Sequence, residues 1–187
     1  MNVGRVKKFG CLVTSFALAA SLSTGALAQS TQMEGMKLSN DQPIQIESDQ
    51  LEVHDQSSSA VFTGNVNVVQ GTTTLKAGKM TVYYVKQGQS SGNAASVASG
   101  NADIDKIDVS DNVFLSSETQ QATADTGHFD MQAQTFVLQG KQVVLSQGQN
   151  VFVGCKLTVH MQTGEAKLDA CGGRVKIQLD PKSKQKP

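Results

Sequence analysis

The chain has 187 residues, and its 16 basic residues balance its 16 acidic residues, so the formal net charge is zero. No segment gathers lysines and arginines into one patch, which disfavours a nucleic-acid-binding protein, because such proteins carry a basic face. Aromatic residues make up only 5% of the chain and tryptophan is absent, so a stacking platform for sugars is not expected.

The first 28 residues have the three parts of a secretory signal peptide. Three basic residues within the first eight positions precede an apolar run from about Phe9 to Leu22, and Ala26-Leu27-Ala28 ends the segment. We expect cleavage after Ala28. The alternative is an uncleaved membrane anchor, for which the run is short and interrupted by serines. Cleavage leaves 159 residues with 13 basic and 16 acidic side chains, a net charge of −3.

A polar segment over residues 29–42 is expected to form an N-terminal arm. From Pro43 onward, apolar residues recur at every second position in short segments that polar turns separate, as at 51–53, 60–68 and 75–84. This period of two predicts β-strands with one apolar face, and no part of residues 29–187 shows sustained helical periodicity.

Four segments of the chain align without gaps. They begin at Asp49, Gly78, Asp125 and Cys155 and each places apolar residues two positions apart. A second match pairs Ala60-Val-Phe-Thr-Gly64 with Phe136-Val-Leu-Gln-Gly140. A repeat of about 30 residues that consists only of short strands predicts a stacked β architecture.

The excess residues between the second and third repeats are rich in glycine, serine and alanine. We interpret residues 86–103 as a flexible insert between strands, and the polar, basic residues 180–187 as a disordered tail.

Two cysteines, Cys155 and Cys171, lie outside the signal peptide. An even pair in an exported chain predicts a disulfide, because export leads to an oxidising compartment. A metal site is the alternative, but His160 is the only histidine nearby and no Cys-x-x-Cys spacing occurs.

Signatures of catalysis are absent from the sequence: it lacks a nucleophile elbow, a phosphate-binding loop and a zinc-protease motif. His54 and His160 occupy equivalent positions of the repeat on its outer face, and we interpret them and His128 as solvated. Acid pairs such as Asp103/Asp105 and Asp108/Asp111 are interpreted as the solvated edge of the insert.

The apolar residues of the predicted strands share one face. In a filled barrel or sandwich they would form the core. If the strands are bent and stacked, the same face lines a long apolar groove that suits acyl chains. The predicted groove residues are Ile44, Ile46, Leu51, Val53, Phe62, Val66, Val68, Met80, Val82, Phe129, Phe136, Leu138, Val143, Leu157 and Val159, and Met131, Leu145 and Val153 share their parity.

The segments 42–53, 60–71 and 75–82 resemble the OstA-like family. They read Gln-Pro-Ile-Gln-Ile-Glu-Ser-Asp-Gln-Leu-Glu-Val, Ala-Val-Phe-Thr-Gly-Asn-Val-Asn-Val-Val-Gln-Gly and Leu-Lys-Ala-Gly-Lys-Met-Thr-Val. The similarity is strong over residues 42–85 and continues more weakly to about residue 179. It implies an all-β domain over 43–179, a β-jellyroll or β-taco of stacked antiparallel V-shaped rungs with an open apolar groove.

The resemblance also implies a function. Family members are passive carriers without a cofactor or catalytic residues, which bind lipopolysaccharide through its lipid A acyl chains in the periplasm. Protomers associate head to tail and connect an inner-membrane anchored OstA-like partner with an outer-membrane translocon. Ile44 and Ile46 lie in the matching motif, whereas the other groove positions rest on alternation. The insert and the cysteine pair depart from the motif.

Two other hypotheses stay open. One is an envelope β-solenoid with a structural or polysaccharide-binding role and a filled interior. The other is a polysaccharide-cleaving enzyme that uses Asp103, Asp105 or Asp108. An open apolar groove would favour the lipid carrier, and a filled core would favour the solenoid.

Overall fold

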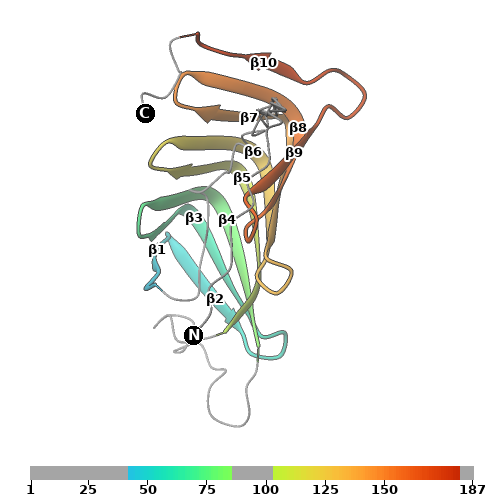
Figure 1. The fold of residues 1–187 in the computed structure, drawn as a ribbon. Helices are drawn as coiled ribbons and strands as arrows, with labels where there is room; N and C mark the ends of the chain where they lie inside the picture. The colour runs from blue at the N-terminus through green and yellow to red at the C-terminus, as the bar shows by residue number, and fades with distance from the viewer. Residues whose placement is uncertain (1–41, 86–102, 182–187) are drawn as a thin grey trace, which may run out of the picture. The chain divides into compact units, whose positions relative to one another are not determined.

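The computed structural model describes residues 42–85 and 103–181, which form ten strands and, within these ranges, no helix (Figure 1). Accordingly, no helix of the described part could cross a bilayer. The strands are β1 Gln45–Glu47, β2 Gln50–His54, β3 Ser59–Gln70, β4 Thr73–Tyr84, β5 Ile104–Ser117, β6 Gln120–Asp130, β7 Thr135–Gln147, β8 Asn150–His160, β9 Glu165–Asp169 and β10 Lys176–Gln178.

Several sequence predictions concern residues outside the described part. They are the signal peptide with its cleavage after Ala28, nearly all of the arm, the insert up to residue 102, and the tail beyond residue 181. At the start of the predicted tail, the backbone N–H of Asp180 donates a hydrogen bond to Oδ1 of Asn150 at 3.0 Å, so ordered chain extends to that residue.

All ten strands belong to one antiparallel sheet. The order is β1-β3-β4-β5-β6-β7-β8-β10, with β2 also paired to β3 and β9 also paired to β8. The sheet is open, since its two ends do not pair with each other within the described residues. The predicted all-β class with stacked antiparallel rungs is confirmed.

Each long strand bends near its middle. The register shifts between Thr63 and Val66 in β3 and at matching places in β4 to β7, so the bends line up across the sheet. Bulges of this kind bend a strand and increase its twist. The line of bends, here called the fold line, divides the sheet into a β1 arm, which contains β1 and β10, and a β2 arm, which contains β2 and β9 (Figure 1).

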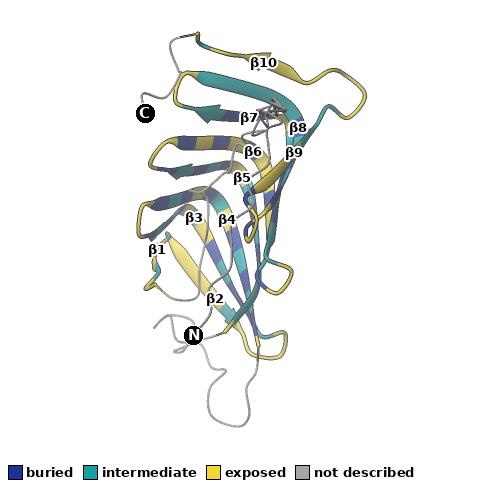
Figure 2. Cartoon of the chain, in the orientation of Figure 1, coloured by how far each residue is buried: buried dark blue, intermediate teal, exposed yellow. Residues whose placement is uncertain are grey.

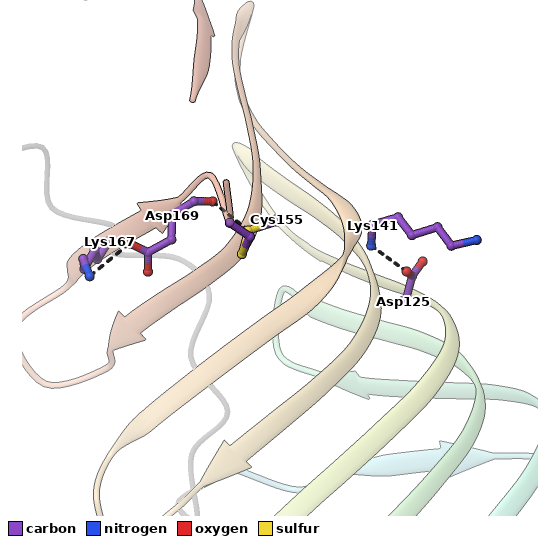
Figure 3. The surroundings of a disulfide bond; sticks show 6 residues. Asp125, Lys141, Cys155, Lys167 and Asp169 are labelled. Carbon is purple, nitrogen blue, oxygen red and sulfur yellow. Dashed lines mark hydrogen bonds and ion pairs between the residues drawn. A yellow bond between two sulfur atoms is a disulfide. The ribbon is translucent and has the colours of Figure 1, made fainter. Parts of the chain in front are cut away.

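An aspartate meets a glycine of the neighbouring strand along the fold line. At Gly64, whose φ is +78°, a Cβ would lie 2.3 Å from Oδ2 of Asp49. At Gly140, a Cβ would lie 2.8 Å from the backbone nitrogen of Asp125. That same aspartate accepts a hydrogen bond of 2.8 Å from the backbone N–H of Lys141 (Figure 3). The sequence repeat therefore corresponds to a contact that recurs in the structure. In this contact the glycine leaves room for an aspartate, whose carboxylate accepts a hydrogen bond at the bulge.

Replacing Gly140 by alanine is expected to lower the free energy of unfolding by about 1–3 kcal/mol, because the new methyl group meets backbone that cannot rotate away. The measurement is a denaturant titration with Gly173→Ala as the control, since the nearest atom to a Cβ there is 3.6 Å away. Equal midpoints for the two variants would contradict this account of the fold line.

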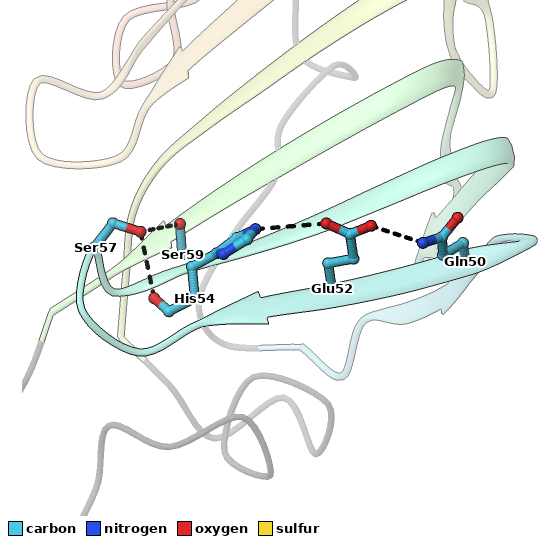
Figure 4. A network of polar contacts seen from close by, with 5 residues as sticks. All are labelled: Gln50, Glu52, His54, Ser57 and Ser59. Atoms are coloured by element: carbon cyan, nitrogen blue, oxygen red, sulfur yellow. Dashed lines mark hydrogen bonds and ion pairs between the residues drawn. The ribbon is translucent and has the colours of Figure 1, made fainter.

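Each end of the sheet is formed by two short strands, one on each arm. On β2 the outward side chains are polar and bonded to one another: Nε2 of Gln50 donates to Glu52 at 2.7 Å, and His54 lies 3.7 Å from the same carboxylate (Figure 4). Polar and charged side chains on an edge strand limit uncontrolled pairing with other chains.

The inner faces of both arms form one hydrophobic cluster. Burial alternates along the strands, and the most exposed ribbons are the short ones at the two ends (Figure 2). Phe129 and Phe136 stack with their ring centroids 5.4 Å apart.

Candidate functional site

Three rows of inward-facing residues cross the sheet at right angles to its strands. Members of a row are direct partners on successive strands, so their side chains adjoin on one face. The row of the β1 arm is Ile46, Val68, Leu75, Leu115, Ala122, Leu145, Phe152 and Ile177. The rows of the β2 arm are Leu51, Phe62, Met80, Val109, Gly127, Leu138, Leu157 and Leu168, and Val53, Ala60, Val82, Ile107, Phe129, Phe136, Val159 and Ala166.

The rows are buried in their middle and exposed at their ends. Leu75 and Leu138 are fully buried, whereas Leu51 is 43% exposed and Ile177 is 58% exposed. The rows therefore end in apolar side chains that have no further strand beside them within the described part.

The structure brings most of the predicted groove residues together. Eleven of the fifteen are buried in the cluster: Phe62, Val66, Val68, Met80, Val82, Phe129, Phe136, Leu138, Val143, Leu157 and Val159. Ile44, Ile46 and Val53 are partly buried and pack against it. Leu51 heads one row at the exposed end. Their contact with lipid stays a prediction.

Sequence reasoning missed residues of every row, namely Leu75, Ile107, Val109, Leu115, Ala122 and Phe152, and it also missed the buried core residue Val113. Four of them lie on β5, whose start was interpreted as the edge of the insert. The alternation of Ile107 and Val109 with Asp108 and Ser110 was a usable signal. The assignment of Val153 to the inner face was wrong: the bulge in β7 makes Val144 its partner and places Phe152 opposite the buried Leu145.

One row contains a residue without a side chain. A Cβ at Gly127 would lie 2.8 Å from Val109 and 2.9 Å from Leu138, its two partners in the row. These neighbours already fill the space above the glycine, so the apolar lining continues across it.

The two arms are joined only through the bends. Every strand pairing of the described part connects neighbouring rungs, and none connects the β1 arm with the β2 arm. Side-chain packing alone therefore holds the inner faces together.

The outer face carries the polar residues considered for chemistry. Asp105 and Asp108 lie in strand β5 and not on a loop edge, and each has a partner: Gln132 donates to Asp105, and Nδ1 of His128 bonds Asp108. Among the described residues, no group of three or more His, Cys, Asp or Glu side chains could hold a metal ion.

Tyr84 is the buried titratable group at the tip of the β2 arm. Burial, and secondly the negative charge of Asp55, raise the pKa of Tyr84 above its ordinary value of 10. The phenol is therefore neutral at physiological pH and adds no charge to the inner face.

The predicted disulfide between Cys155 and Cys171 is present, with a Cα–Cα distance of 5.9 Å. It ties β8, next to the fold line, to the turn that follows β9, and Sγ of Cys155 lies 3.2 Å from the carbonyl oxygen of Asp169 (Figure 3). On the exposed side of β9, Lys167 and Asp169 form an ion pair of 3.0 Å. The disulfide thus fastens the last rung of the sheet.

Comparison with known proteins places this geometry in a family. An uncharacterised protein of Rhizobium meliloti (strain 1021) is 62% identical over 169 residues, which are 89% of this chain and 88% of that protein. An uncharacterised protein of Rhizobium etli, from the 5′ region of an rpoN-linked probable transport protein, is 75% identical over 44 residues, 24% of this chain and 82% of that protein.

A solved structure shares the fold. The crystal structure of LptH from Pseudomonas aeruginosa, described as the LptA-homologous periplasmic component of the lipopolysaccharide transport device, matches with a TM-score of 0.61 at 20% identity. The match covers 76% of this chain and 98% of LptH. Residues 45–165 match the family described as LptA/(LptD N-terminal domain) LPS transport protein, and the chain belongs to this family of lipopolysaccharide transport proteins.

Proposed function

We propose that this protein binds lipopolysaccharide through its lipid A acyl chains and carries it across the periplasm as part of a bridge from the inner to the outer membrane. The observation that carries the proposal is the set of three apolar rows, which run across the sheet from one end to the other. Family membership supports transport, and the rows supply a surface that suits the acyl chains.

The dimensions of the rows suit acyl chains. Neighbouring strands lie ~4.8 Å apart, so a row across eight strands spans roughly 34 Å, longer than one extended chain. Burial of methylene groups contributes about 0.8 kcal/mol each, so a chain of roughly 12 carbons can supply about 9 kcal/mol. Chain burial would carry the affinity, since the expected mature protein is net negative and does not attract anionic head groups.

Access to the rows depends on the two arms. The arms share no strand pairing in the described part, so an acyl chain that enters between them breaks no backbone hydrogen bond of the sheet. It replaces apolar side-chain contacts by apolar contacts with lipid, at little cost in buried apolar surface.

The two ends of the sheet would be the surfaces through which the protein associates with its neighbours in the bridge. Leu51 and Ile177 expose the apolar rows at opposite ends, beside edge strands whose hydrogen-bonding groups are open to a further strand. Pairing with a second copy, with an inner-membrane anchored partner of the same fold or with the outer-membrane translocon would extend the rows head to tail. The disulfide fits the oxidising periplasm.

A photo-crosslinking experiment tests the proposal. A photoreactive residue at Ile46 or Leu51, on the inner face, is expected to capture lipopolysaccharide. The same residue at the neighbouring, outward-facing Gln45 or Glu52 is expected to capture little. Equal capture from inner and outer positions would contradict binding in the groove.

A structural β-solenoid is the second candidate, because the middle of the rows is buried in this structure. The same experiment separates the two candidates. A solenoid with a permanently filled interior would give no lipid adduct from either inner position.

A further inference from the structure

The inner face of the β1 arm ends in a polar row. Three two-residue turns, at 71–72, 118–119 and 148–149, form the tip of this arm, and the inward residues beside them are all uncharged and polar. These residues, here called the tip row, are Gln70, Thr73, Ser117, Gln120, Gln147 and Asn150. Direct pairing joins Gln70 with Thr73 and runs from Ser117 through Gln120 and Gln147 to Asn150.

The other arm ends differently. At the tip of the β2 arm, the residues two positions after Val82, Phe129 and Val159 are Tyr84, Met131 and Met161, and all three are buried. These three positions of the β2 arm hold two thioethers and one phenol, so its border is less polar than the tip row of the β1 arm.

Four of the six tip-row residues are buried although their side chains are polar, and Gln147 and Asn150 are partly buried. Gln70, Thr73 and Gln120 are only 3–4% exposed, and Ser117 is 7% exposed. Oε1 of Gln120 has no hydrogen-bond donor among the described residues. A buried, unpaired amide oxygen costs about 1–3 kcal/mol, so an apolar residue would make a more stable sheet at this position. Oε1 of Gln120 is therefore an acceptor without a donor among the described residues.

We propose that the tip row is a subsite for the head group of the bound lipid, and that it recognises hydroxyl and amide groups of an acylated amino sugar. This inference rests on the proposed function. Gln120 is the next inward residue after Ala122, and Ser117 and Gln147 stand in the same relation to Leu115 and Leu145. Since a strand rises ~3.4 Å per residue, the tip row lies roughly 7 Å beyond the apolar row, so a sugar joined to acyl chains in the groove can reach it.

The chemistry of the row selects among head groups. Oε1 of Gln120 requires a donor, which an amide N–H or a sugar hydroxyl supplies and a phosphate dianion does not. The six residues include no lysine, arginine or histidine that would neutralise a phosphate. Sugar hydroxyls and the amide link of an N-linked acyl chain therefore match the row best.

Affinity measurements with two probes test the inference. Gln120→Leu keeps the volume and removes the acceptor, and Gln121→Leu is the matched control, because Gln121 is the neighbouring residue on the outer face and is exposed. We expect Gln120→Leu to weaken the binding of lipopolysaccharide about tenfold, the loss from one buried hydrogen bond. Binding of a fluorescent fatty acid, which lacks the sugar, should stay unchanged in both variants.

The outcomes separate this inference from the proposed function. If the wild-type protein binds neither probe, the lipid carrier and its head-group subsite both fail. If both probes bind but Gln120→Leu loses neither or loses both equally, only the subsite fails. A lower melting temperature of Gln120→Leu would assign the residue to folding and overturn the inference, whereas an unchanged or higher value agrees with it. Gln147→Leu, the next residue of the row, should repeat the selective loss.

Discussion

Replacing Phe136 by alanine is expected to destabilise the protein by about 3–5 kcal/mol, the range for deleting a fully buried aromatic side chain. Phe136 stacks on Phe129 of the neighbouring strand, lies in the buried middle of its row and is fully buried itself. Because both arms share one cluster, the cavity would open between them and remove contacts from each. A denaturant titration followed by circular dichroism measures the loss.

Phe114 provides the matched control. It lies on β5, but its side chain faces outward and is only partly buried, so Phe114→Ala is expected to cost clearly less than Phe136→Ala. Equal losses for the two variants would mean that the inner face contributes no more to stability than the outer face, and that the core lies elsewhere.

Removing the disulfide should have the second largest effect. The bridge closes a loop with a sequence separation of 16, for which the chain-entropy estimate is about 3 kcal/mol. The variant that carries both Cys155→Ala and Cys171→Ala is expected to lose about this amount. Reduction of the wild-type protein with a thiol should produce a similar shift, and the melting temperature of both samples measures it.

The loss should also be local. The disulfide fastens the turn between β9 and β10, and β10 pairs with β8 through only three residues, all exposed. Faster amide hydrogen exchange in β9 and β10, with unchanged exchange in β3 and β4, is therefore expected in the double variant. Uniform acceleration across the sheet would contradict a local role.

Much of the fold could be predicted from the sequence, because the alternation of apolar residues and the repeat are both visible in short segments of the chain. Period-two alternation reports which side chains share a face, and it placed residues such as Phe62, Met80 and Leu138 correctly on the inner one. The repeat reports the fold line, since Gly64 meets Asp49 and Gly140 meets Asp125 at the same spacing of 15 residues. Both signals belong to residues close to one another in the chain or in the repeat.

The remaining features depend on register, which alternation does not specify. The register shift between β7 and β8 changes the parity of the inward residues of β8 from Leu157 to Phe152, so Phe152 instead of Val153 faces the interior. The start of strand β5 was not predicted, because Asp105 and Asp108 are residue types typical of loops. Their partners Gln132 and His128 on the following hairpin are visible only in the structure. The tip row escaped notice because glutamine and serine beside a turn are ordinary in sequence. Only the pairing shows that they adjoin.

Strand pairings in the described sheet run only between adjacent rungs, so the sheet is organised along one dimension. In such an array, stability is a sum of local terms and nearest-neighbour terms, and disruption at one end need not spread to the other. The number of hairpins in the chain then sets the length of the sheet. Duplication of one hairpin would add two rungs, lengthen all three rows together and leave the existing pairings in register.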